Sequence, residues 1–171
     1  SMILYGQEGP VESDAALASE PLFVIQEKGN DRAATLRRGP WFVCVSAFTA
    51  KISPARWHQD RQNLVSIYHD QAGLILGGGN TKLQPAWSSF TVGDMNLLKH
   101  KPGDEEPNFM PTGPLVHVPT SAKLIREPQP GVDLVYGKER CAIHIRIKDD
   151  HTLEYVVSSA VQGELPVLAH V

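Results

Sequence analysis

The sequence predicts an all-β fold, an antiparallel β-sandwich of two packed sheets with little helix. The first observation is period-two alternation: in CAIHIRIK, residues 141–148, Cys141 and three isoleucines alternate with a mostly polar set of side chains. The second is spacing, because an extended apolar run recurs about every ten to fifteen residues. The third is that no helical pattern is long enough to cover a parallel sheet. Two sheets stacked face to face account for all three observations.

Each predicted strand is a short apolar or alternating run bounded by turn residues, of which the chain has many, with 14 Gly and 13 Pro. The predicted strands are 22–27, 34–38, 41–48, 63–69, 73–78, 122–127, 133–137, 141–148, 152–159 and 165–170. The run at 41–48 is apolar on both faces, which predicts a central strand covered on both sides, with Trp41 in the core. Segments 12–20 and 53–60 are expected to be at most short helices. Segment 99–121 is expected to be a long surface excursion.

Length and charge narrow the class of protein. The chain has 171 residues, the size of one domain, and a net charge of −3. Nucleic acid is not expected as a partner, because the densest basic group is only Arg32, Arg37 and Arg38. A membrane is not expected either, since no apolar run reaches the roughly 20 residues of a span. We expect Ser1-Met2 to be the remnant of an expression tag and the chain to be a piece of a longer protein.

The two cysteines, Cys44 and Cys141, both lie in apolar runs. Buried free thiols are the expected state, because one pair in a chain this long is not a disulfide framework. A disulfide stays possible for an exported protein. The cysteine count therefore leaves the compartment open.

The glycine-rich stretch GGGNTK, residues 77–82, resembles a phosphate loop only in outline. A P-loop needs Gly-Lys-Ser/Thr directly before a helix, whereas here Lys82 is followed by Leu-Gln-Pro. A dinucleotide fingerprint fails for the same reason. We therefore expect no cofactor and interpret the glycines as a strand exit through positive φ, with an anion-binding nest of loop amides near Lys82 as the alternative.

Titratable residues gather just before and within the predicted strand 63–69. His58, Asp60, Arg61, His69 and Asp70 include the imidazole and carboxylate groups that metal sites and catalytic triads use. Their spacing matches no metal or nucleophile motif. A structural network of ion pairs and hydrogen bonds is the first interpretation. A metal site that uses His58 or His69 is the alternative.

The segment DRQNLVSIYHDQAGLILGGGNTKLQPAWSSF, residues 60–90, resembles part of the C-terminal β-sandwich of bacterial heparinase II/III-like proteins. The resemblance implies relatives of polysaccharide lyases, which combine a helical toroid with stacked antiparallel sheets, and a periplasmic or secreted location. No catalytic residue carries over, because the lyase acids and bases come largely from the toroid and the cleft beside it. The resemblance implies a non-catalytic module beside a helical catalytic domain of the parent chain. The matched positions are Asp60, Arg61, Gln62, Asn63, Tyr68, His69, Gly77, Gly78, Gly79, Asn80, Lys82 and Gln84.

An acidic polysaccharide is the partner that this resemblance favours. Aromatic faces stack on sugar rings, and basic or amide side chains bond hydroxyls and carboxylates. Candidate residues with this mixture are Arg56, Trp57, Lys82, Gln84 and Trp87. The alternative for the two tryptophans is a role as aromatic plugs at the sandwich ends. Two other functions stay open: a metal-dependent enzyme acting on carbohydrate, and a protein interaction domain with an exposed apolar sheet face.

Overall fold

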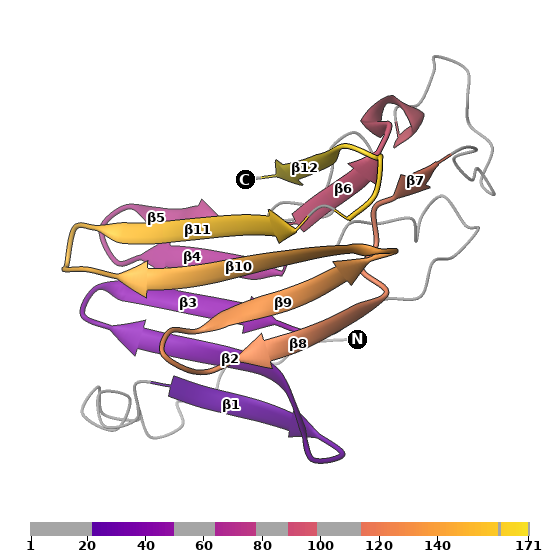
Figure 1. Ribbon diagram of the computed structural model, residues 1–171. Helices are drawn as coiled ribbons and strands as arrows, with labels where there is room; N and C mark the ends of the chain where they lie inside the picture. Colours follow the sequence, from indigo (N-terminus) through magenta and orange to yellow (C-terminus); the bar gives the residue numbers. More distant parts are fainter. Residues whose placement is uncertain (1–21, 50–63, 78–88, 99–113, 161, 171) are drawn as a thin grey trace, which may run out of the picture.

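The computed structural model describes residues 22–49, 64–77, 89–98, 114–160 and 162–170. These residues form three antiparallel sheets and one short 3-10 helix, which confirms the predicted all-β class (Figure 1). Sheet A contains, in spatial order, β1 (Leu22–Glu27), β2 (Asn30–Arg38), β3 (Trp41–Ser46), β4 (Val65–His69) and β5 (Gly73–Leu76). Sheet C has the order β11 (Leu153–Ala160), β10 (Glu139–Ile147), β9 (Gly131–Tyr136) and β8 (Ser121–Ile125). Sheet B has the order β12 (Val167–His170), β6 (Ser89–Gly93) and β7 (Leu115–Val116), and the helix η1 (Met95–Leu98) follows β6.

Sheets A and C pack face to face because each has one apolar face (Figure 1). On β3, Val43 and Val45 are buried, and on β10, Ile143 and Ile145 are buried, with one residue between the members of each pair pointing the other way. All four side chains belong to one apolar cluster that spans the sheets. The alternation visible in the sequence is therefore the inner face of the sandwich.

The turn between β10 and β11 is fastened to one end of sheet A. The indole Nε1 of Trp41 donates to the carbonyl oxygen of Asp149 at 2.9 Å. The guanidinium of Arg38 donates to the carbonyl oxygen of Ile147 at 3.3 Å. Gly39, in the turn between β2 and β3, has φ +55°, a left-handed conformation that other residues rarely adopt, so a substitution there would strain the turn.

Sheet B packs against sheet C through Phe90 and Tyr136, whose rings meet edge to face with centroids 5.9 Å apart. The backbone N–H of Phe90 donates to the Tyr136 hydroxyl at 3.3 Å, and burial raises the pKa of Tyr136. Every residue of β6 is buried. Gly93 ends the strand with φ +101°, at a place where a Cβ would lie only 1.9 Å from the Pro114 carbonyl oxygen.

The structure confirms the hairpin of β10 and β11, the core position of Trp41 and the strand 22–27. One expectation is wrong: β3 is not covered on both faces, since Phe42 is 37% exposed and Cys44 is half-buried. Cys44 and Cys141 are both free thiols. Sequence reasoning missed β6, because a strand buried on both faces shows no alternation. The predicted helices 12–20 and 53–60 lie outside the described residues, as does most of the predicted excursion 99–121.

Replacing Ile143 by alanine should lower the free energy of unfolding by about 2–5 kcal/mol, because the side chain is fully buried between the sheets and the change leaves a cavity. Urea unfolding followed by circular dichroism measures this. The matched control is Leu74→Ala on β5, where the side chain is 58% exposed, and its effect should stay within about 0.5 kcal/mol. Equal losses in both variants would contradict the assignment of the core.

Candidate functional site

The residues predicted to contact carbohydrate lie outside the described part of the chain. This holds for Arg56, Trp57, Lys82, Gln84 and Trp87, and also for His58. The predicted loop site therefore stays a prediction. Of the titratable residues that gather around the predicted strand 63–69, the structure places His69 and Asp70.

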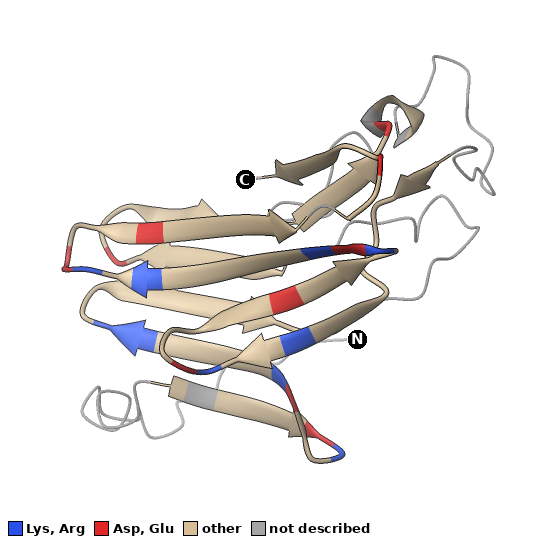
Figure 2. Ribbon diagram, viewed as in Figure 1, with Lys and Arg blue, Asp and Glu red and all other residues tan. Residues whose placement is uncertain are grey.

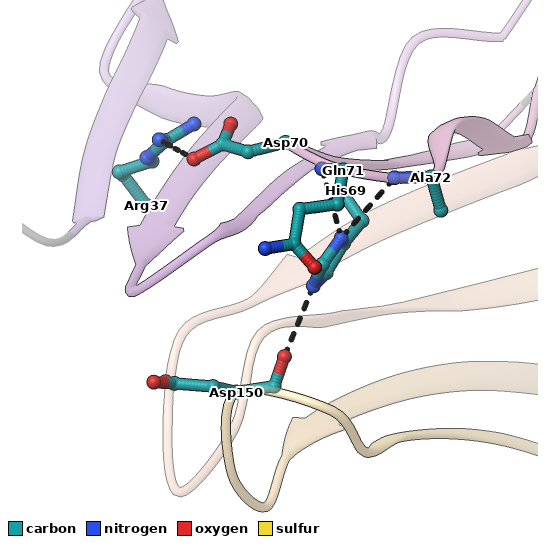
Figure 3. A network of polar contacts seen from close by, with 6 residues as sticks. All are labelled: Arg37, His69, Asp70, Gln71, Ala72 and Asp150. Atoms are coloured by element: carbon teal, nitrogen blue, oxygen red, sulfur yellow. Dashed lines mark hydrogen bonds and ion pairs between the residues drawn. The ribbon is translucent and has the colours of Figure 1, made fainter.

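His69 is buried at the end of β4 and uses both of its ring nitrogens. Nε2 lies 3.0 Å from the carbonyl oxygen of Asp150, and Nδ1 accepts from the backbone N–H of Gln71 at 3.2 Å and of Ala72 at 3.4 Å (Figure 3). These partners fix the neutral tautomer with the proton on Nε2. The ring also meets Trp41 edge to face at 4.6 Å. In this arrangement His69 holds the β4–β5 turn against the β10–β11 turn.

No group of three or more potential metal ligands occurs among the residues that the structure describes. Cys44 and Cys141 lie on different sheets, and burial raises the pKa of each thiol, that of Cys141 to about 11. The short helix among the described ranges lacks the length and apolarity needed to cross a bilayer.

The outer face of sheet A carries a row of side chains that crosses four strands, and we call it the sheet A row. Arg37 on β2 pairs in register with Phe42 on β3, Phe42 pairs with Tyr68 on β4, and Tyr68 pairs with Leu74 on β5. Tyr68 is 40% exposed and Phe42 37% exposed. Directly opposed residues on one face have Cβ atoms about 5 Å apart, so Phe42 and Tyr68 project from neighbouring positions. The neighbouring outward pair is Thr35 on β2 and Cys44 on β3.

An ion pair lies at the Arg37 end of the sheet A row. Arg37 Nη2 donates to Asp70 Oδ2 at 2.5 Å, and the two side chains are 38% and 44% exposed (Figure 3). A pair this exposed contributes little to stability, because water competes for both charges. Arg37 is therefore held beside Phe42 and can exchange its partner at small cost.

The outer face of sheet C has a different character. Arg146 and Lys148 pair with Glu154 at 3.3 and 3.1 Å, and Lys123 and Asp133 lie opposite each other in register. Figure 2 shows these charges on β8 to β11. Polar side chains on one outer face and an aromatic row on the other distinguish the two sheets. An exposed apolar row is unusual on a sheet that faces only water.

The sequence predicts the orientation of only one member of this row, Tyr68. Alternation in residues 63–70 predicts that Tyr68 and His69 lie on opposite faces of the strand, and the structure confirms it, with His69 buried and Tyr68 exposed. It could not place Phe42 beside Tyr68, because the pairing of β3 with β4 joins segments separated by residues 47–64, and nothing in the sequence fixes that register. The signal available was the Trp-Phe pair at 41–42, in which only one ring can face inward.

Comparisons of the sequence with protein-family models and with curated proteins, and of the structure with solved structures, found no match.

Another partly buried histidine is His170 on β12. Its Nε2 lies 2.7 Å from Oγ1 of the buried Thr91 on β6. Burial lowers the pKa of His170 from 6.5, because the charged imidazolium loses hydration. The folded state therefore favours the neutral ring.

His69→Phe should lower the free energy of unfolding by about 1–3 kcal/mol, because it keeps a ring against Trp41 but leaves the Asp150 carbonyl and the two turn amides without their partner. Urea unfolding measures the loss, with the exposed Tyr68→Phe as control. A melting temperature of the wild-type protein that falls on addition of EDTA would contradict this structural role.

Stability should fall as the pH drops, because the folded pKa of His170 lies below its unfolded value of 6.5. The contribution of His170 is fully present above about pH 6.5 and is lost as the pH falls through the lower folded pKa. Urea unfolding at about pH 7.5 and about pH 5 tests this. His170→Gln should show a smaller drop between the two conditions than the wild type, and an identical drop would contradict the assignment.

Proposed function

We propose that this chain is a non-catalytic β-sandwich module that weakly binds an acidic polysaccharide and supports a catalytic domain related to the heparinase II/III-like lyases. One observation carries the binding half of the proposal: the sheet A row places Arg37, Phe42 and Tyr68 side by side on an outer sheet face. The lyase association rests on the sequence resemblance in residues 60–90.

The chemistry of the row suits a sugar chain. The exposed faces of Phe42 and Tyr68 offer adjacent apolar surfaces on which the C–H side of a pyranose ring can stack. A stacked chain that runs across the strands would pass from these rings to Arg37. The planar guanidinium donates two parallel hydrogen bonds to a carboxylate, so it would select a uronate over a neutral sugar.

Asp70 sets the affinity in this scheme. Asp70 already forms an ion pair with Arg37, so a uronate carboxylate must displace the Asp70 carboxylate before it can bond the guanidinium. The exchange replaces one carboxylate by another, and the net gain is small. The sheet face is also open rather than enclosed, so a bound sugar buries only one side. Both features predict weak binding, which becomes useful when a parent chain supplies further contacts.

A protein interaction domain is the second candidate function. Leu74, the β5 member of the row, is 58% exposed, and Ile25 on the neighbouring strand β1 is 46% exposed; neither side chain offers a hydrogen bond to a sugar. A helical partner domain could bury these aliphatic side chains together with the two rings. The binding experiment below separates the two functions, because a protein interface does not require recognition of sugar.

Phe42→Ala and Tyr68→Ala should each weaken binding to a uronate oligosaccharide by roughly three- to tenfold, because each removes one stacking surface. Arg37→Gln should remove the preference for the uronate over its carboxyl-reduced form. Asp70→Asn should strengthen uronate binding, because it frees Arg37. Titration of the ligand into isotopically labelled protein, followed by NMR, measures all four.

The matched control is Leu168→Ala, an exposed aliphatic residue on sheet B. It should leave binding unchanged. Uronate binding that survives both ring substitutions would place the glycan site elsewhere on the chain. Absence of any binding would leave the interaction domain as the better function.

A further inference from the structure

Strand β11 forms an edge of sheet C that no described strand covers. Within the described ranges it pairs only with β10, and the register is continuous from Leu153 to Ala160 with no bulge. In Figure 1 it is the long yellow strand at the margin of the sandwich. An uncovered edge presents a row of backbone groups that can accept another strand.

Hydrogen bonding on β10 shows which groups of β11 face outward. The N–H of Ile145 donates to the Pro130 carbonyl oxygen on the β9 side at 2.9 Å. The neighbouring His144 therefore directs its groups to β11, where its register partner is Val156. By alternation, Val156 and Ser158 bond β10, and Val157 directs its N–H and C=O away from the sheet.

The edge of β11 also lacks the features that usually block pairing with another strand. From residue 155 to residue 160 the strand contains no charged residue and no proline, and Val156 is 43% exposed. The other described edges differ. Both β1 and β5 have register irregularities, β8 carries Lys123, and β7 and β12 are short. Charges, bulges and short strands are the devices by which proteins block unwanted pairing.

A depression opens beside this edge, between sheets C and B. It is lined by Phe90, Val157, Ser158, Ser159, Val167 and Ala169. A strand added to β11 would extend sheet C over this depression. The side chains of the added strand that point toward the depression would then be removed from water.

We propose that a second copy of this chain pairs with β11 through its own β11, antiparallel about a twofold axis at Val157. The pairing joins the two copies of sheet C into one continuous sheet. Val157 must lie opposite its symmetry mate, because its backbone groups face outward and because this centre pairs every residue from 154 to 160. Val156 then lies opposite Ser158 of the other copy.

Charge complementarity identifies the second copy as the occupant. In this register Glu154 lies opposite Ala160 of the other copy, so the only acidic residue of the strand never faces itself. Ala160 is the register partner of Arg140 on β10, so Arg140 of the other copy would lie one position beyond Glu154 and add a third cation to the Arg146 and Lys148 that already pair with it. Arg140 is exposed and makes no ion pair within the described residues. The strand is therefore complementary to itself in backbone pattern and charge.

The test measures molar mass by light scattering on a sizing column over about a hundredfold range of protein concentration. We expect a wild-type protein that approaches the dimer mass as concentration rises. Val157→Pro should be monomeric, because it removes an outward N–H at an edge position where proline is tolerated. Circular dichroism checks that this variant is folded.

Arg140→Glu provides a second variant that touches no backbone bond. It places a carboxylate near Glu154 of the other copy and should raise the dimer dissociation constant about tenfold or more. Ile25→Ala, an exposed residue on β1 at the edge of sheet A away from β11, should dimerise as the wild type does. A wild-type protein that stays monomeric throughout would overturn the proposal. A dimer that withstands both Val157→Pro and Arg140→Glu would overturn it too.

Discussion

Mutual burial of the inner faces of sheets A and C is the interaction on which the rest of this structure depends. Val43 and Val45 on one sheet, and Ile143 and Ile145 on the other, are buried only because the opposite sheet covers them. Neither sheet could remove its apolar face from water alone. Sheet B then attaches to this sandwich through Phe90 and Tyr136, and covers another part of the same cluster.

Polar contacts join the two sheets at both ends, with three side chains of sheet A reaching the β10–β11 turn at one end and Arg126 pairing with Asp31 at the other. Arg38, Trp41 and His69 come from three successive strands of sheet A and all reach backbone carbonyls between residues 147 and 150. Backbone carbonyls in a turn have no strand partner, so these side chains satisfy groups that would otherwise need water. The arrangement explains the burial of His69 without any role in chemistry.

The two surfaces that we propose as functional use different parts of the sandwich. The sheet A row lies on a sheet face, where side chains would recognise a ligand, whereas β11 lies at a sheet edge, where backbone groups would recognise another strand. Sheet A and the outer edge of sheet C do not share residues, so glycan binding and self-association can be tested by separate variants. A twofold dimer would present two copies of the sheet A row, which raises the effective affinity for a long polysaccharide.

The sequence by itself determined the all-β class, the β10–β11 hairpin and the inward positions of β10, because these depend on alternation within one strand and on short turns. It also placed His69 and Tyr68 on opposite faces of their strand, and the structure decided which face is buried. It did not determine that Phe42 is exposed, that β6 is a buried strand, or that Arg37 lies beside the two rings. Those facts depend on register between strands distant in the chain and on which face the other sheet covers, and only the tertiary structure decides both.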